Sequence, residues 1–109
     1  MKVYWSNIEY RYTTVSVVNK CVGGMVYVFV KAKDAIAALD KIRNALLSQD
    51  KIILKCEFIS PYNVKTEIWA ESKEFGSAEN TTEHYKELYQ AARQSKEPVF
   101  DYFWEYEKL

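Results

Sequence analysis

A strand, helix and strand pattern occurs twice in this 109-residue chain, over residues 24–60 and again over residues 62–107. Each copy has a stretch with two-residue alternation, then apolar residues at three- and four-residue steps, then a further alternating stretch. Two such units in succession are typical of a sheet domain that also contains helices, and this length suits one domain with its own core. We therefore expect residues 1–109 to form a single α+β domain.

The first unit contains the clearest elements. In residues 25–31 the alternation places apolar side chains on both faces, which predicts a central strand. Asp34 stands where a helix N-cap belongs, and the helix is expected to continue through Ser48. Its inward positions recur at helical spacing and are Ile36, Leu39, Ile42 and Leu46. Residues 51–60 alternate again and predict a strand with one buried face.

The second unit repeats this order with weaker signals. Residues 64–70 alternate and predict a strand. Asn80 and Glu83 have the spacing of a capping box, so a second helix is expected from there to about Gln94. A last strand is predicted over residues 99–106.

The combined order resembles the ferredoxin-like, or split βαβ, arrangement, in which two helices cover one face of an antiparallel sheet. The other face of the sheet is then open. Residues 3–18 predict an extra N-terminal strand, and together with the turn-like residues 19–24 and the run that follows they resemble a hairpin or bent strand pair. In that arrangement the strand near residues 24–32 already has two neighbours, so the extra strand is expected either to pair with an edge or to displace the C-terminal strand.

Side-chain alternation predicts what the open face carries. If Val26, Ile52, Val64 and Tyr102 point toward the helices, the reverse face carries the aromatic residues Trp5, Tyr27, Phe29, Trp69 and Phe103, together with Lys55, Lys65, Glu67, Asp101 and Glu105. Soluble monomers rarely expose an apolar patch of this size. We expect the N-terminal segment, a second copy of the chain, or another protein to cover it.

The net charge of zero is the sum of two opposite halves. Residues 1–56 carry nine Lys or Arg and four Asp or Glu, which gives +5, whereas residues 57–109 carry six and eleven, which gives −5. Strands from both halves can interleave in one sheet, so the division need not be spatial. Its other interpretation is an acidic patch that faces a basic partner.

The sequence shows no arrangement typical of catalysis or metal binding. His84 follows Glu83 in the second predicted helix and is expected to face solvent without a partner. Cys21 and Cys56 lack zinc-site spacing, and we expect reduced thiols. Residues 23–24 are a Gly pair without the Lys and Ser or Thr of a phosphate loop, and are expected to mark a hairpin turn. We therefore expect no enzyme activity, metal or cofactor.

Nucleic acid and membrane partners are also not expected. The chain has no RNP motif and no net positive charge to attract phosphates. Its longest apolar run, residues 22–30, is about half the roughly 20 residues of a membrane-spanning helix. Residues 1–7 lack the apolar stretch of a secretory signal, so a cytoplasmic location is expected.

The segment YVFVKAKDAIAALDKI, residues 27–42, resembles the strand-into-helix segment of small bacterial α+β domains that include immunity proteins of polymorphic toxin systems. Such immunity proteins bind one toxin and block its active site, often with acidic residues against a basic nuclease. The resemblance implies a partner protein, such as a basic toxin.

From these patterns we expect a small protein-binding module of the immunity-inhibitor type. The residues expected to contact the partner are aromatic or acidic: Tyr27, Phe29, Trp69, Asp101, Phe103, Glu105 and Glu107. The alternative is a homodimeric ferredoxin-like α+β barrel that encloses a small ligand and can be enzymatic. A purely structural subunit is a third class.

Overall fold

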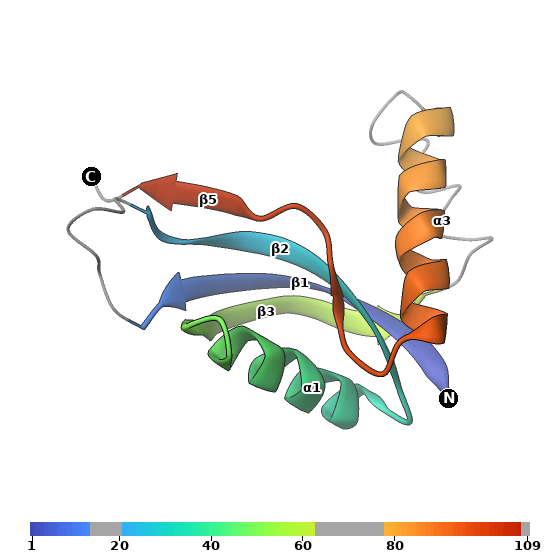
Figure 1. Ribbon diagram of the computed structural model, residues 1–109, viewed down its shortest axis with the longest axis horizontal. Helices are drawn as coiled ribbons and strands as arrows, with labels where there is room; N and C mark the ends of the chain where they lie inside the picture. Colours follow the sequence, from blue (N-terminus) through green and yellow to red (C-terminus); the bar gives the residue numbers. More distant parts are fainter. Residues whose placement is uncertain (14–20, 63–77, 108–109) are drawn as a thin grey trace.

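The computed structural model describes residues 1–13, 21–62 and 78–107, which form one antiparallel sheet and two helices (Figure 1). In chain order the elements are β1 (Lys2–Tyr12), β2 (Cys21–Ala32), α1 (Ala35–Leu47), β3 (Lys51–Pro61), α3 (Ala78–Gln94), β4 (Val99–Phe100) and β5 (Trp104–Glu107). The predicted α+β class is confirmed. The strand predicted over residues 64–70 lies outside the described residues.

The strand order is β3-β1-β2-β4, and β5 pairs with the other half of β2. β1 pairs antiparallel with β2, as the predicted hairpin or bent strand pair requires. Both predicted placements of the N-terminal strand in the ferredoxin-like sheet are wrong, because β1 lies in the middle of the sheet between β2 and β3. It is antiparallel to both neighbours, so β2 and β3 run parallel and α1 connects them across β1. This is a split βαβ unit whose middle strand comes from the start of the chain.

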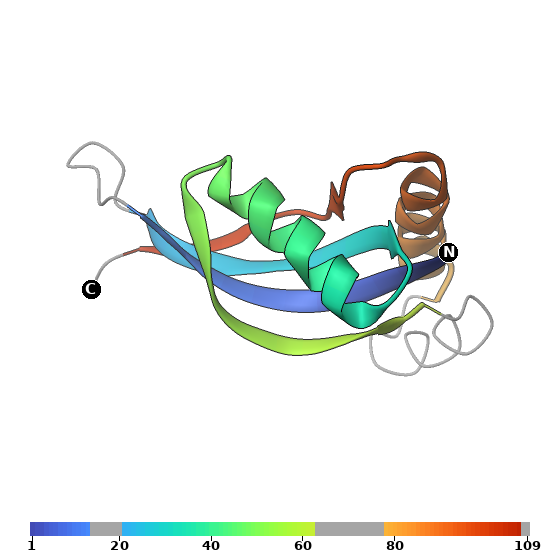
Figure 2. The ribbon, with the colours of Figure 1, turned by 90° about the horizontal axis from the view of Figure 1, so that it is seen from below.

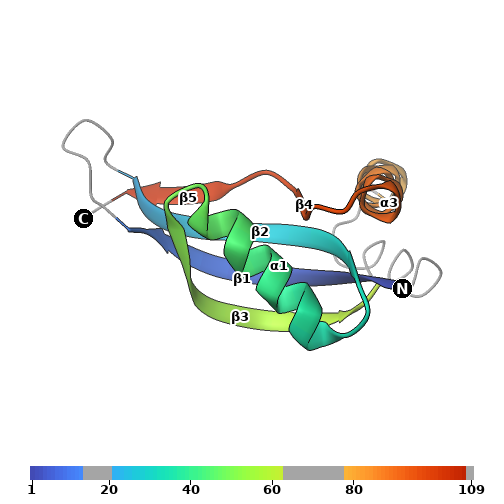
Figure 3. The ribbon, with the colours of Figure 1, turned by 60° about the horizontal axis from the view of Figure 1, so that its bottom comes forward.

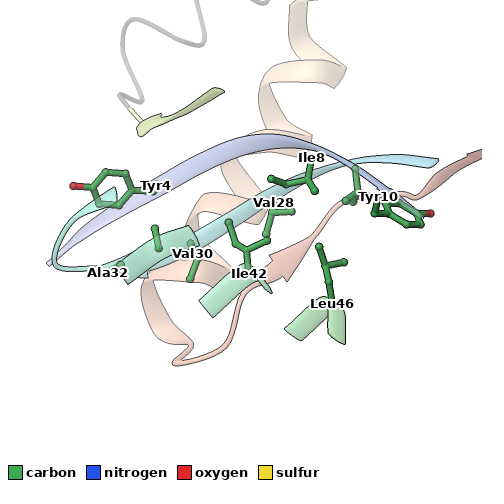
Figure 4. Close-up of a cluster of buried hydrophobic side chains, with 10 residues drawn as sticks. Tyr4, Ile8, Tyr10, Val28, Val30, Ala32, Ile42 and Leu46 are labelled. Atoms are coloured by element: carbon green, nitrogen blue, oxygen red, sulfur yellow. The ribbon is translucent and has the colours of Figure 1, made fainter. Parts of the chain in front are cut away.

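Helix α1 forms where the sequence predicts it, but Ile36, which was expected to point inward, is 76% exposed. The Asp34 side chain accepts a hydrogen bond of 2.7 Å from the Ala37 amide, as an N-cap does. Its inward face is completely buried against β1 and β2 and consists of Ala38, Ile42 and Leu46 (Figure 4). The turn into β3 contains Asp50 at φ 60°, a left-handed conformation that a short polar residue tolerates better than most.

Helix α3 packs on the opposite face of the sheet, across the end where the chain begins (Figures 1 and 2). Its residues Tyr85 and Ala92 are buried with Val3, Phe29 and Tyr62, whereas α1 contacts the side chains that alternate with these. The expectation that both helices cover one face is therefore wrong. The physical reason is the apolar character of both faces of β2, which gives each helix a separate face to bury.

The glycine pair lies inside β2 and is not a hairpin turn. A Cβ atom at Gly23 would lie 2.3 Å from the Tyr10 carbonyl oxygen, and one at Gly24 would lie 2.5 Å from the Trp104 carbonyl oxygen. Both distances are far below normal contact. The glycines therefore allow β1 and β5 to approach β2 closely from its two sides.

Candidate protein-binding surface

The residues expected to contact a partner do not share one surface. Phe29 is 0% exposed and belongs to the core under α3. Tyr27 is half-buried on the same face, where its ring stacks on Trp5 with centroids 6.0 Å apart. Trp69 lies outside the described residues, and so does the side chain of Glu107, although Glu107 ends β5.

Phe103 and Glu105 lie on the α1 face, not on the reverse face as expected. The ring of Phe103 packs against Tyr10 and Phe100, with centroid separations of 5.7 and 5.5 Å. The ammonium group of Lys51 lies 4.2 Å from the centre of the Phe103 ring. Phe103 therefore closes the edge of the α1 core and is only half exposed.

Glu105 is held by two tyrosines of β1. The hydroxyl of Tyr10 donates to its Oε2 over 2.8 Å, and the hydroxyl of Tyr12 donates to the same oxygen. Burial, and then the hydrogen bond to this carboxylate, raise the pKa of Tyr12 to about 12 and raise the pKa of Tyr10 further. The carboxylate therefore anchors β5 to β1 across β2.

Asp101 and His84 form a pair that sequence reasoning missed. His84 Nε2 lies 2.7 Å from Asp101 Oδ1, and the same oxygen accepts a 2.8 Å bond from the Tyr102 amide. The ring of Tyr102 stacks on the His84 ring at an interplanar angle of 3°. The expectation of a histidine without a partner is therefore wrong. The pair has no local sequence signal, because the two residues are 17 positions apart and meet only through the fold.

An aromatic cluster covers the reverse face next to α3. Trp5 lies at its centre, with ring centroids 4.9 to 6.3 Å from those of its neighbours Tyr27, Phe29, Phe58, Tyr62 and Tyr85. Most of the aromatic side chains expected on an open face are thus enclosed by the chain itself. What a partner can reach on this face lies further along the sheet, beyond α3.

That reachable part is an aromatic strip, which we define as Tyr102, Trp104 and Tyr106. Their side chains are 77%, 74% and 41% exposed. All three lie on the α3 face: Tyr102 stacks on His84, Trp104 pairs across the strands with Met25, and the Tyr106 hydroxyl donates to Glu9 over 3.2 Å. Strict alternation predicts Tyr102 on the opposite face, and neither Trp104 nor Tyr106 was among the expected contact residues.

A groove of about 190 Å³ runs beside the strip and is lined by Asn7, Met25, Val26, Tyr27 and Trp104. The side-chain oxygen of Asn7 is buried and has no hydrogen-bond partner within the described chain. The groove therefore offers mainly apolar walls to a partner side chain.

The strip also borders a sheet edge. Among the described strands, β5 hydrogen bonds only to β2, so its other side presents backbone amide and carbonyl groups at the edge (Figure 3). Such an edge can pair with a strand of another chain.

Within residues 1–13, 21–62 and 78–107, no three His, Cys, Asp or Glu side chains gather closely enough to hold a metal ion. Cys21 and Cys56 are not joined by a disulfide. Neither helix that the structure describes is long and apolar enough to cross a lipid bilayer.

Comparison of the chain with protein-family models, with curated proteins and with solved structures finds no match.

Proposed function

We propose that this chain is a small protein-binding module, in the concrete form of an immunity-type inhibitor that binds and neutralises a partner toxin or enzyme in the cytoplasm. The observation that supports this most is the aromatic strip, with Tyr102 at 77% and Trp104 at 74% exposure on one face. Tyr and Trp are the residue types enriched at the energetic centres of protein interfaces. Three of them on one face within residues 102–106 differ from singly scattered exposed apolar residues.

Charge favours a basic partner. The segment that carries the strip, residues 97–107, contains four Asp or Glu and no Lys or Arg. Asp101 and Glu105 bond to groups of their own chain, yet their negative charge still contributes to the field around the strip. Such a field raises the association rate with a basic surface and disfavours acidic partners.

The edge strand gives the proposal a binding mode. A partner strand that pairs with β5 would gain backbone hydrogen bonds and place alternate side chains over the strip. Trp104 would fill the centre of the contact, and one partner side chain would enter the groove next to it.

The homodimeric barrel receives less support. In that proposal two open sheet faces pack together around a ligand, but α3 already covers one end of the face that would be used. The ferredoxin-like resemblance is accordingly limited to the sheet, with β1 in the position of the third strand.

Affinity capture from the native host tests the proposal with two variants. Trp104→Ala removes the centre of the strip, where the side chain is 74% exposed. Ile36→Ala is the control, because it removes an apolar side chain of α1 that is 76% exposed. We expect wild type and Ile36→Ala to capture the same protein and to inhibit its activity in a stoichiometric assay. Trp104→Ala should bind about 30-fold more weakly, which corresponds to about 2 kcal/mol.

Two outcomes would contradict this reading. Equal affinity of Trp104→Ala and wild type would remove the strip from the interface. If light scattering instead shows a homodimer that Trp104→Ala dissociates, the strip binds a second copy and the inhibitor proposal fails.

A further inference from the structure

A larger hollow lies at the other end of the sheet from the aromatic strip. Its volume is about 670 Å³, and it opens where the start of β1, the end of β2 and the last turn of α3 meet. Figures 1 and 3 place the N-terminus beside this end of α3. The volume falls within the roughly 300–1,000 Å³ of small-molecule sites.

Among the described residues, the charged ones that line this hollow are all basic: Lys2, Lys31 and Arg93. None of the three is paired with a carboxylate in that part of the chain, because the ion pairs there involve Arg43, Lys55 and His84. Lys2 lies opposite Ala32, which belongs to the α1 core, so the cations on the α3 face are Lys31 and Arg93. Two like charges beside one hollow repel each other. A bound anion would remove this repulsion.

Two of these cations are held in place by neighbours that do not neutralise them. The Lys31 ammonium donates to the Arg93 carbonyl oxygen over 3.0 Å, which leaves its other two N–H groups for a ligand. The Arg93 guanidinium carbon lies 5.8 Å from the centre of the Tyr89 ring. A planar guanidinium held in this way can donate two parallel hydrogen bonds to a phosphate.

The remaining wall is aromatic. The rings of Tyr62 and Tyr89 line the hollow with centroids 5.4 Å apart and an interplanar angle of 37°. Tyr62 is buried, so this wall is fixed to the core under α3. Such a wall suits the organic part of a ligand, whereas the cations suit a compact group with more than one negative charge.

We infer that this pocket binds a small phosphomonoester, with its phosphate between Lys31 and Arg93 and its organic part against Tyr62 and Tyr89. A phosphomonoester carries about −1.5 to −2 charges at neutral pH, which matches the unpaired cations better than a single carboxylate does. The site is separate from the aromatic strip and does not depend on the inhibitor role.

An NMR titration of the full chain with ribose 5-phosphate tests this inference. We expect saturable shifts of the amide signals of Lys2, Lys31, Tyr62, Tyr89 and Arg93, and weaker binding at raised salt. The double variant Lys31→Gln and Arg93→Gln should bind at least about tenfold more weakly, since it loses two charged hydrogen-bond donors. Arg43→Gln is the matched control, because this arginine is exposed on α1 and pairs with Asp40 over 2.9 Å.

The variants and two further ligands decide the outcome. An unchanged affinity in the double variant, with its amide spectrum still dispersed as in the wild type, would overturn the site. Succinate binding as tightly as ribose 5-phosphate would overturn the assignment to phosphate. Inorganic phosphate binding as tightly would overturn the role of the tyrosine wall, whereas weaker binding of both supports the inference.

Discussion

Phe29 tests most sharply whether α3 encloses one face of the sheet. Its side chain is 0% exposed, and its ring centroid lies 6.0 Å from that of Trp5, 5.1 Å from that of Tyr62 and 6.0 Å from that of Tyr85. Truncation of a fully buried Phe to Ala typically costs about 3–5 kcal/mol. With aromatic neighbours on several sides, we expect Phe29→Ala to lower the free energy of unfolding by about 4 kcal/mol.

Urea unfolding followed by circular dichroism measures this loss, with the slope of the transition checked for each variant. Because small domains have only about 5–15 kcal/mol in total, Phe29→Leu provides a milder second variant with an expected loss of about 1.5 kcal/mol. Ile36→Ala, at a side chain 76% exposed, should change stability by no more than about 0.5 kcal/mol. A loss below about 1 kcal/mol in Phe29→Ala would refute the enclosure of this ring.

Three further perturbations test other contacts. Folding raises the pKa of Tyr12 from 10.0 to about 12. The stability that its hydroxyl contributes is therefore complete below about pH 10 and is lost as the pH rises toward 12. In Glu105→Gln, unfolding measured across this range should show a smaller loss of stability at alkaline pH. Gly24→Ala would bring a Cβ atom to 2.5 Å from a carbonyl oxygen of β5. Urea unfolding should then show a free energy of unfolding lower by about 1–3 kcal/mol. An unchanged unfolding midpoint would contradict the close approach of the strands. In the same assay Asp34→Ala should lower the free energy of unfolding by about 1 kcal/mol. Asp34→Ser should lower it much less, since serine keeps an acceptor for the Ala37 amide. Equal losses in the two variants would argue against the cap.

Much of the first unit could be predicted from the sequence because its signals are local. The cap at Asp34 and the helical spacing of Ile42 and Leu46 predicted α1, and the two apolar faces of β2 predicted a central strand. The second helix and its end at Gln94 were also predicted. The contacts of this helix were not predicted, because they depend on which face of β2 it reaches.

The remaining errors come from pairing and from breaks in alternation. Register shifts in the pairing of β1 with β3 place Cys56 on the α1 face and Phe58 against Trp5 on the other, although strict alternation puts them together. Between β4 and β5 the alternation breaks again, so Tyr102 and Phe103 lie on the faces opposite to those predicted. No residue type in the sequence marks these shifts.

Consequently the candidate surface was only partly predicted. The alternation and charge of the C-terminal segment predict a surface in an aromatic and acidic strand, and the exposed strip does lie there. The contact residues predicted in that strand include Phe103 and Glu105, whose side chains instead lie against Lys51 and Tyr10. The outward residues of the same strand can be identified only when the face of each is known.

Amide hydrogen exchange of the chain, alone and in complex with the protein it captures, tests the central claim most directly. If the strip and the edge of β5 form the docking surface, exchange should slow on binding at residues 102–107 and stay unchanged in α1. Protection confined to α1 or β3, with residues 102–107 exchanging as in the isolated chain, would contradict the account.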